Sequence, residues 1–292
     1  MSLFDVLNQN FTFFIIASAI FGLTIGSFLN VVIYRLPKMM EQEWREQSLE
    51  YLGQQEESTS TPRMTLATPN STCPHCGHGI RPWENIPVIS YLALRGRCGK
   101  CKASISPRYP AVELLTGILT VVVVSHFGAS WQSLLAFIFT AYLISMSFID
   151  FDTQLLPDQL TLPLLWLGLI ANSFELFTTL QDAVWGAVFG YLALWTVYQL
   201  FKLLTGKEGM GYGDFKLLAA LGAWMGWQAL PTIILLSSLV GAIIGISLIL
   251  FRGRDRQVPI PFGPYLAIAG WIALLWNQEI TQAYLQFSGI GR

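Results

Sequence analysis

Charged residues are scarce in this chain. Only 12% of its 292 residues are Asp, Glu, Lys or Arg, whereas 53% are hydrophobic, and the mean hydropathy is +0.51. Water-soluble globular domains carry about 25% charged residues, so this composition excludes an ordinary soluble domain. It indicates a polytopic membrane protein.

Several catalytic patterns are also absent. The sequence has no His-Glu-x-x-His motif, no Walker loop and no Gly-rich dinucleotide fingerprint. A Ser-His-Asp set on one face and a convincing internal repeat are missing as well. Zinc-hydrolase, nucleotide-driven and serine-nucleophile mechanisms therefore lose most of their support. We expect a membrane lipid environment and no nucleic-acid partner.

No Lys or Arg precedes Arg35, so the N-terminus lacks the charged region of a cleaved signal peptide. The apolar run that ends before Arg35 is therefore expected to be a retained membrane span. Within this run, Gly22 and Gly26 form a small-xxx-small pair, which predicts close packing against another helix.

About eight apolar runs are long enough, or nearly so, to cross roughly 30 Å of hydrocarbon. Trp227 and Pro231 alone mark the break between the sixth and seventh runs, so seven spans are an alternative. We predict an all-α polytopic fold of about eight transmembrane helices. The runs cover residues 12–34, 110–128, 131–149, 159–177, 182–202, 214–230, 231–251 and 260–277.

Basic residues are confined to a few segments. Of the 17 Lys and Arg residues, ten lie in 35–108, three in 202–216 and three in 252–256. Basic loops stay in the cytoplasm, so eight spans with a periplasmic N-terminus place all three groups on the cytoplasmic side. Asp150 and Asp214 then lie at the cytoplasmic ends of the third and sixth spans.

The four cysteines of the chain form two Cys-x-x-Cys pairs inside the basic segment that follows the first span. Facing pairs supply four thiolates for tetrahedral Zn²⁺, and four protein ligands leave no position for water or substrate. A redox site would need one pair and a thioredoxin-like pattern, which is absent, and disulfides are disfavoured in the cytoplasm. His75 or His78 in place of one thiol is a further alternative. We predict a structural, ribbon-like zinc site of Cys73, Cys76, Cys98 and Cys101.

The remainder of this insert is polar. Met39 to Gln55 predicts a surface helix, and residues 56–62 predict a flexible linker. The expected organisation is a first span at 1–36, a zinc-binding insert at 37–109 and a membrane core at 110–292.

Asp214 follows Gly211-Tyr212-Gly213 at the start of an apolar run, where a carboxylate is costly and needs a reason. Capping of the next helix is an open alternative for Asp214, and it is the preferred interpretation of Asp158. Glu113 is expected in the first turn after Pro110, where an acid suits the helix dipole.

Capping does not explain Asp150. It ends an apolar run, where the helix dipole disfavours an anion. Asp152 is two residues further on and does not share its helix face. Two close carboxylates cannot both ionise easily, which lets them divide acid and base roles as in aspartic proteases. We therefore predict that Asp150, rather than Asp152, is the partner of Asp214.

The ordered motifs resemble those of the type IV prepilin peptidases, membrane aspartic proteases of the GxGD class. The resemblance covers nearly the whole chain. It rests on Gly26 to Pro37, the two cysteine pairs, Ser106 to Pro110 with Glu113, Ile149-Asp150 with Leu155 to Asp158, Gly211 to Asp214 with Lys216-Leu217, and Pro261 to Pro264.

This resemblance implies that Asp150 and Asp214 are catalytic, that the substrates are type IV prepilins and type II secretion pseudopilins, and that the enzyme lies in the bacterial inner membrane with its active site on the cytoplasmic side. Many members also methylate the new N-terminus with S-adenosylmethionine, and the glycine matching Gly96 is associated with that activity. For Gly96, a simple turn before the second cysteine pair is an equal alternative. Two other functions compete: an ion-coupled transporter that uses the two aspartates, and a non-catalytic pilus assembly factor.

Overall fold

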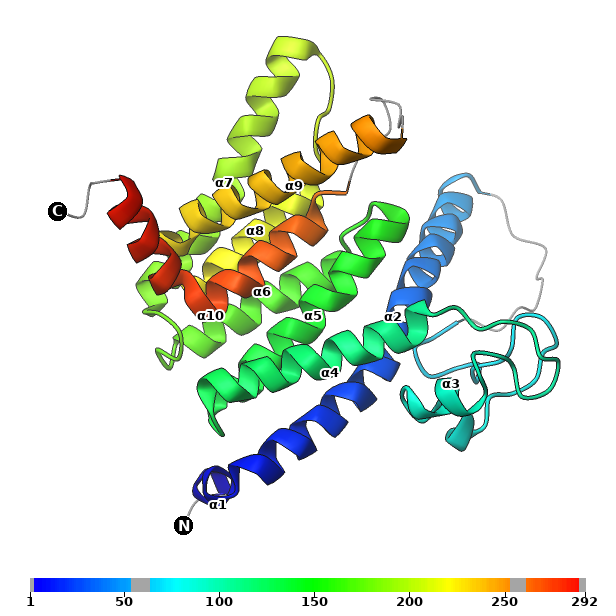
Figure 1. Cartoon of the computed structure of the whole chain (residues 1–292). Coiled ribbons are helices and arrows are strands. Elements are labelled where there is room, and N and C mark those ends of the chain that lie inside the picture. The colour runs from blue at the N-terminus through cyan, green and yellow to red at the C-terminus, as the bar shows by residue number, and fades with distance from the viewer. Residues whose placement is uncertain (1–2, 54–63, 253–260, 289–292) are drawn as a thin grey trace. The chain divides into compact units, whose positions relative to one another are not determined.

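The computed structural model describes residues 3–53, 64–252 and 261–288. All regular elements in these ranges are helices (Figure 1), which confirms the all-α prediction. The α-helices are α1 (Leu3–Gln9), α2 (Phe11–Tyr51), α3 (Ile89–Ala93), α4 (Arg108–Phe127), α5 (Trp131–Thr153), α6 (Asp158–Asn172), α7 (Leu180–Thr205), α8 (Tyr212–Met225), α9 (Leu230–Arg252) and α10 (Gly263–Ser288), with short 3-10 helices η1 (Pro82–Asn85) and η2 (Trp227–Ala229).

The chain divides into two compact units, Met1–Ala129 and Ser130–Arg292. In the first unit α2 packs along α4. A Cβ added at Gly22 would lie 2.5 Å from Oγ1 of Thr120, and one added at Gly26 would lie 2.7 Å from Cα of Glu113. The two glycines therefore allow the helices to approach closely, as predicted from their spacing.

Helix α2 differs from the prediction. A membrane span and a separate surface helix were expected, but one helix of 41 residues runs from Phe11 to Tyr51 and contains Pro37. Proline removes one helical hydrogen bond without forbidding the turn that follows, and the Glu- and Gln-rich sequence after it favours helix. The predicted linker at 56–62 and residues 54 and 55 lie outside the described residues.

Helix α8 forms the core of the second unit. It packs against α6, α7, α9 and α10, and its Phe215, Leu218 and Trp224 side chains are fully buried. A Cβ at Gly222 would overlap the backbone at Gly186, so the two glycines bring α7 and α8 into backbone contact. Nε1 of Trp224 donates to the carbonyl of Leu164 at 2.8 Å, which ties α8 to α6.

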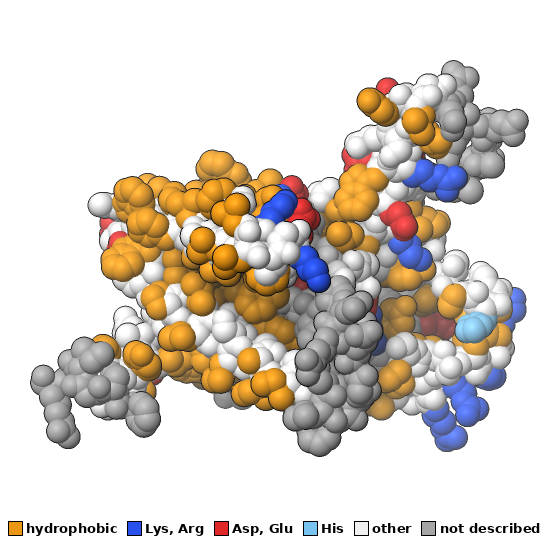
Figure 2. Space-filling view, turned by 90° about the horizontal axis from the view of Figure 1, so that it is seen from above, with side chains coloured by type: hydrophobic (Ala, Val, Ile, Leu, Met, Phe, Trp, Pro, Cys, Tyr) orange, Lys and Arg blue, Asp and Glu red, His pale blue; other side chains and the backbone are white. Residues whose placement is uncertain are grey.

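Five helical segments in the described residues are long and apolar enough to cross a membrane: α2, α4, α5, α7 and Trp227–Ser247. Helices α6 and α8 have only 15 and 14 residues, fewer than the roughly 20 that a lone span needs. The count of about eight spans stays a prediction. Hydrophobic side chains cover much of the visible surface of the helices (Figure 2), as lipid contact requires.

The structure has a break in the helix near the predicted boundary between the sixth and seventh apolar runs. Helix α8 ends at Met225, and Gly226 adopts a φ of +81°, which is accessible to glycine without strain. Helix η2 follows, and α9 begins at Leu230.

Candidate active site and cysteine cluster

Asp214 is the third residue of α8 and is 8% exposed. The N-cap position belongs to Gly211, whose backbone is extended at φ −81° and ψ 150°. The amide of Asp214 donates to the Gly211 carbonyl at 3.3 Å. The N-cap alternative for Asp214 is therefore wrong, although its place in the first turn still suits the helix dipole.

Asp150 lies in the last turn of α5 and is 5% exposed. Helix α5 ends at its C-cap residue Gln154, which adopts the left-handed conformation at φ 56°. The Gln154 amide donates to the Asp150 carbonyl at 2.8 Å. The amide of Gly263, at the start of α10, donates to Oδ2 of Asp150 at 3.0 Å. Asp152 is exposed, which agrees with its place on a different helix face from Asp150. Asp150 is thus a buried acid at the end of a helix that gives it no dipole stabilisation.

Leu156 packs against Gly213, the residue before Asp214, and against Gly263, whose amide binds Asp150. A Cβ added at Gly213 would lie 2.6 Å from Cβ of Leu156, and one added at Gly263 would lie 3.1 Å from its Cδ1. The same added atom at Gly263 would be 2.7 Å from Oδ2 of Asp150. The two buried carboxylates, one from α5 and one from α8, therefore each have a neighbouring residue that packs on Leu156.

Sequence reasoning missed the roles of Leu156 and Gly263. Both stand in motifs that carried the family resemblance, but neither residue has a side chain with an obvious chemistry. The available signal was the Pro-Phe-Gly-Pro sequence at 261–264, where a glycine lies between two prolines at the start of a helix.

Asp158 does not cap α6, contrary to the prediction. Pro157 occupies the N-cap position, and Asp158 is the first helical residue. Its two carboxylate oxygens accept hydrogen bonds from Nζ of Lys216 at 2.6 and 2.8 Å. This ion pair joins the start of α6 to α8, two residues after Asp214.

Glu113 is buried and accepts the amide of Val88 at 2.8 Å through Oε2. The expectation that it lies in the first turn is wrong, because α4 begins at Arg108, two residues before Pro110. Its structural role agrees with the expectation, since the contact fixes a loop of the insert to α4.

The four cysteines form one cluster in which all Sγ atoms lie within 4.8 Å of one another. The Sγ atoms of Cys73 and Cys101 are 3.8 Å apart, which fits tetrahedral Zn²⁺ with bonds of about 2.3 Å. Each pair occupies a similar turn. The amide of Cys73 donates to the carbonyl of His78, and the amide of Cys98 donates to that of Ala103, both at 2.8 Å.

The histidine alternative gains no support. His78 contacts Oε2 of Glu84 at 3.3 Å, and the amide of Arg81 lowers the pKa of Glu84 by donating to the same oxygen. Hydrogen bonds from the backbone amides of Cys101 and Lys100 lower the pKa of the Cys98 thiol to about 6.

Gly96 lies in a turn before the second cysteine pair. Its φ is +66°, and a Cβ there would lie 2.9 Å from Oη of Tyr91. Its amide donates to the Tyr91 carbonyl, and its carbonyl accepts from Ile105, each at 2.8 Å. These contacts are those of a structural turn.

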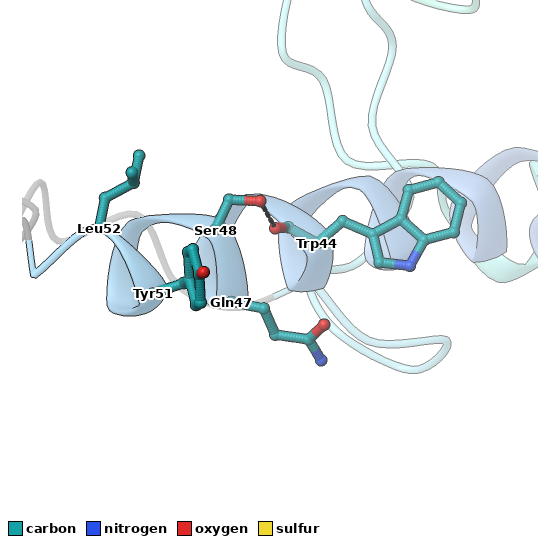
Figure 3. Close-up of a pocket in the computed structure, with 5 residues that line it drawn as sticks. All are labelled: Trp44, Gln47, Ser48, Tyr51 and Leu52. Carbon is teal, nitrogen blue, oxygen red and sulfur yellow. Dashed lines mark hydrogen bonds between the residues drawn. The ribbon is translucent and has the colours of Figure 1, made fainter.

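A hollow at the end of α2 contains none of the predicted site residues. Its walls come from the last turns of one helix and the residue after it, and the hydroxyl of Ser48 donates to the Trp44 carbonyl at 2.7 Å (Figure 3). We assign it no function. It is lined by Trp44, Gln47, Ser48, Tyr51 and Leu52.

Two protein families match this chain. Residues 20–127 match the bacterial Peptidase A24 N-terminal domain, and residues 137–246 match the type IV leader peptidase family. No solved structure matches.

The chain is also similar to curated proteins over nearly its full length. A prepilin leader peptidase/N-methyltransferase of Pseudomonas aeruginosa is 60% identical over 289 residues, which cover 99% of both chains. Proteins of the same description from Stutzerimonas stutzeri (97% of this chain and 98% of the relative) and Aeromonas hydrophila (91% and 92%) are also 60% identical. The chain belongs to the family of prepilin leader peptidases/N-methyltransferases.

Proposed function

We propose that this protein is a membrane aspartic endopeptidase that removes the leader from type IV prepilins and pseudopilins and then methylates the new N-terminus. The observation that carries the peptidase proposal is the pair of buried carboxylates at the ends of α5 and α8, Asp150 and Asp214. The relatives' shared description supports both activities.

In the proposed mechanism one aspartate is protonated and the other is ionised. The ionised carboxylate takes a proton from water as the water oxygen attacks the peptide carbonyl carbon. The protonated partner donates a hydrogen bond to the developing oxyanion, and the carboxyl group that took the water proton then gives it to the leaving amine as the carbon–nitrogen bond breaks. The Gly263 amide donates to Oδ2 of Asp150 and so orients this carboxylate. The two acids titrate as a unit, and either can begin as the base.

The proposed placement is the bacterial inner membrane, with a periplasmic N-terminus and both aspartates on the cytoplasmic side. The distribution of basic residues supports this orientation. In an eight-span arrangement α6 and α8 cross inside the bundle, and the burial of α8 supports that position. A prepilin then presents a basic leader in the cytoplasm and an apolar helix in the membrane, with the cleaved bond at the boundary.

The insert is proposed to hold one structural Zn²⁺ through the four cysteines, whose clustered Sγ atoms support a closed site. S-adenosylmethionine, when bound, supplies the methyl group for the new N-terminal amine. We keep Gly96 as a residue of the methyltransferase region on the strength of the family resemblance, with its contacts to Tyr91 and Ile105 shaping the turn there.

Asp150→Asn and Asp214→Asn test the peptidase proposal. Each variant is expressed with a prepilin, and mass spectrometry reports the cleavage position and any added methyl group. We expect each substitution to lower cleavage by at least about 10²-fold, because each removes one partner of an acid–base pair. The matched control is Asp152→Asn at the exposed neighbouring acid, which should cleave normally. Full cleavage by both variants would refute the proposal, and proton flux through reconstituted protein would then favour a transporter.

A further inference from the structure

The loop before α3 is held at a defined depth along α4. The amide of Val88 donates to Oε2 of Glu113 at 2.8 Å. Glu113 lies five residues after Arg108, where α4 begins, which places it about 7 Å along the helix axis. In the proposed membrane placement α4 is a span, so Val88 and the start of α3 lie at the cytoplasmic boundary of the bilayer rather than in free solution.

This loop is also strained. Val88 has φ 60° and ψ −47°, and the amide of Ile89 reaches the carbonyl of Pro87 at 2.5 Å. The geometry is that of a classic γ-turn, which is rare and unfavourable for a β-branched residue. Glu113 holds the turn in place, and the turn directs the chain into α3.

Arg35 on α2 also holds the insert to the spans of the same unit. Its Nη2 donates to the Pro69 carbonyl at 2.6 Å, and its Nη1 donates to the Thr65 carbonyl at 2.9 Å. Nδ2 of Asn30 on α2 donates to the carbonyl of Tyr109 in the first turn of α4 at 3.0 Å, which ties these two spans together. The insert is therefore held close to the point where α2 and α4 leave the membrane.

Helix α3 exposes apolar side chains at this level. Ile89 is 64% exposed and Leu92 is 67% exposed. They are three residues apart and share one helix face. Ile86, just before the strained turn, is also exposed.

Basic side chains follow directly. Arg95, Arg97 and Lys102 line a hollow beside Leu94, and Figure 2 shows several Lys and Arg side chains gathered at the edge of the insert. Arg95 and Lys102 adopt positive φ angles of 53° and 60°. An apolar face followed by cations is the pattern of a segment that lies in a membrane interface.

We propose that residues 89–102 dock on the anionic lipid surface of the membrane that contains α2 and α4. Ile89 and Leu92 enter the boundary between acyl chains and headgroups, and Arg95, Arg97 and Lys102 contact lipid phosphates. Charge complementarity with an anionic leaflet and the tether at Glu113 identify the lipid as the occupant. The proposal rests on the membrane placement proposed above but not on the catalytic role of either aspartate.

The test uses the full-length protein in nanodiscs of phosphatidylcholine, with and without phosphatidylglycerol. A trace of phosphatidylglycerol carries a photoactivatable diazirine in its acyl chain, and mass spectrometry maps the adducts. We expect adducts on the peptide containing Ile89 and Leu92, and fewer when both are changed to Ser. Each cation near an anionic surface changes the docked population by about fivefold. The double variant Arg95→Gln, Arg97→Gln should therefore lose most of the labelling that depends on phosphatidylglycerol.

Arg81→Gln is the matched control, because Arg81 is an exposed cation of the same insert that lies outside residues 89–102; it should label like the unchanged protein. Zinc content reports whether each variant keeps the insert folded. Adducts on the exposed Leu114 and Ile118 of α4 report membrane placement independently. Labelled α4 with unlabelled α3 would overturn the docking proposal alone, whereas unlabelled α4 would overturn the membrane placement. If soluble glycerol phosphate reduced the labelling of residues 89–102 as much as the removal of phosphatidylglycerol does, the segment would be a site for free anions. That result would also overturn the docking proposal.

Discussion

At the scale of single residues, Gly263 sets the position of Asp150. Its amide binds Oδ2 of the acid, and its missing side chain leaves room for both Asp150 and Leu156. A methyl group there would compete for space with a carboxylate oxygen that the proposed mechanism needs.

Gly263→Ala should therefore lower prepilin cleavage by about 10²-fold, the cost of misplacing a reacting group by roughly 1 Å. The change should act on kcat more than on KM, because it moves a catalytic acid rather than the surface that receives the substrate. Purified variants assayed with a prepilin peptide provide the measurement. Gly79→Ala is the control, since no atom lies within 4 Å of the added Cβ; equal activity of the two variants would contradict the assigned role.

The sequence predicted that Asp150 and Asp214 pair, because eight spans would bring the end of the third and the start of the sixth to the same membrane surface; the structure shows that both acids are buried. The contacts of Leu156 and Gly263 could not, because Gly263 is 113 residues from Asp150 and neither side chain has a distinctive chemistry. The pairing of Asp158 with Lys216 was missed for a similar reason. A local capping rule was applied to an acid whose partner comes from another helix.

At the scale of helices, the Asp158–Lys216 ion pair aligns the first turn of α8 with the start of α6. The two side chains are 54% and 29% exposed, so solvent screens much of the attraction. Such a pair contributes about 0.2–1 kcal/mol to stability. Its larger effect is expected on geometry, because Lys216 follows Asp214 by two residues.

Asp158→Asn and Lys216→Gln should each lower cleavage several-fold while changing the free energy of unfolding by less than about 1 kcal/mol. The double variant should lose little more than either single variant, since both remove the same contact. Kinetic assays and denaturation in detergent would measure the two effects. Fully additive losses in activity would show that the residues act independently.

The two cysteine turns lie outside the helices, and the clustering of their four Sγ atoms predicts how substitutions change the amount of bound zinc. Cys98→Ser should reduce bound zinc well below the roughly one equivalent expected for a four-thiolate site. It should also make residues 64–107 sensitive to protease, because metal binding and folding of such sites are coupled. His75→Ala should retain the metal. Loss of zinc from His75→Ala would instead support a mixed histidine–cysteine site.

At the scale of the whole molecule, composition and the placement of basic residues predicted the helical class and an orientation before any contact was known. Helix boundaries were less predictable. The sequence around Pro37 indicated an end to the first span, but a proline costs only local hydrogen bonding, and the helix continues to Tyr51. Helix α8 has 14 residues, fewer than a lone span needs, and it packs against α6, α7, α9 and α10.

The proposed orientation predicts which loops a protease can reach. In spheroplasts, protease added outside should leave residues 64–107 and 206–211 intact, whereas permeabilised cells should lose both. Tags inserted near residues 129 and 179 should show the opposite accessibility. Cleavage of the insert from the periplasmic side would invert the topology and remove both aspartates from the cytoplasmic surface.

The length of α2 has a mechanical consequence. A helix of 41 residues is about 60 Å long, roughly twice the thickness of the hydrocarbon layer. In the proposed orientation, its polar half therefore extends from the lipid into the cytoplasm. A partner that bound near Tyr51 would then meet the protein at a distance from the lipid surface.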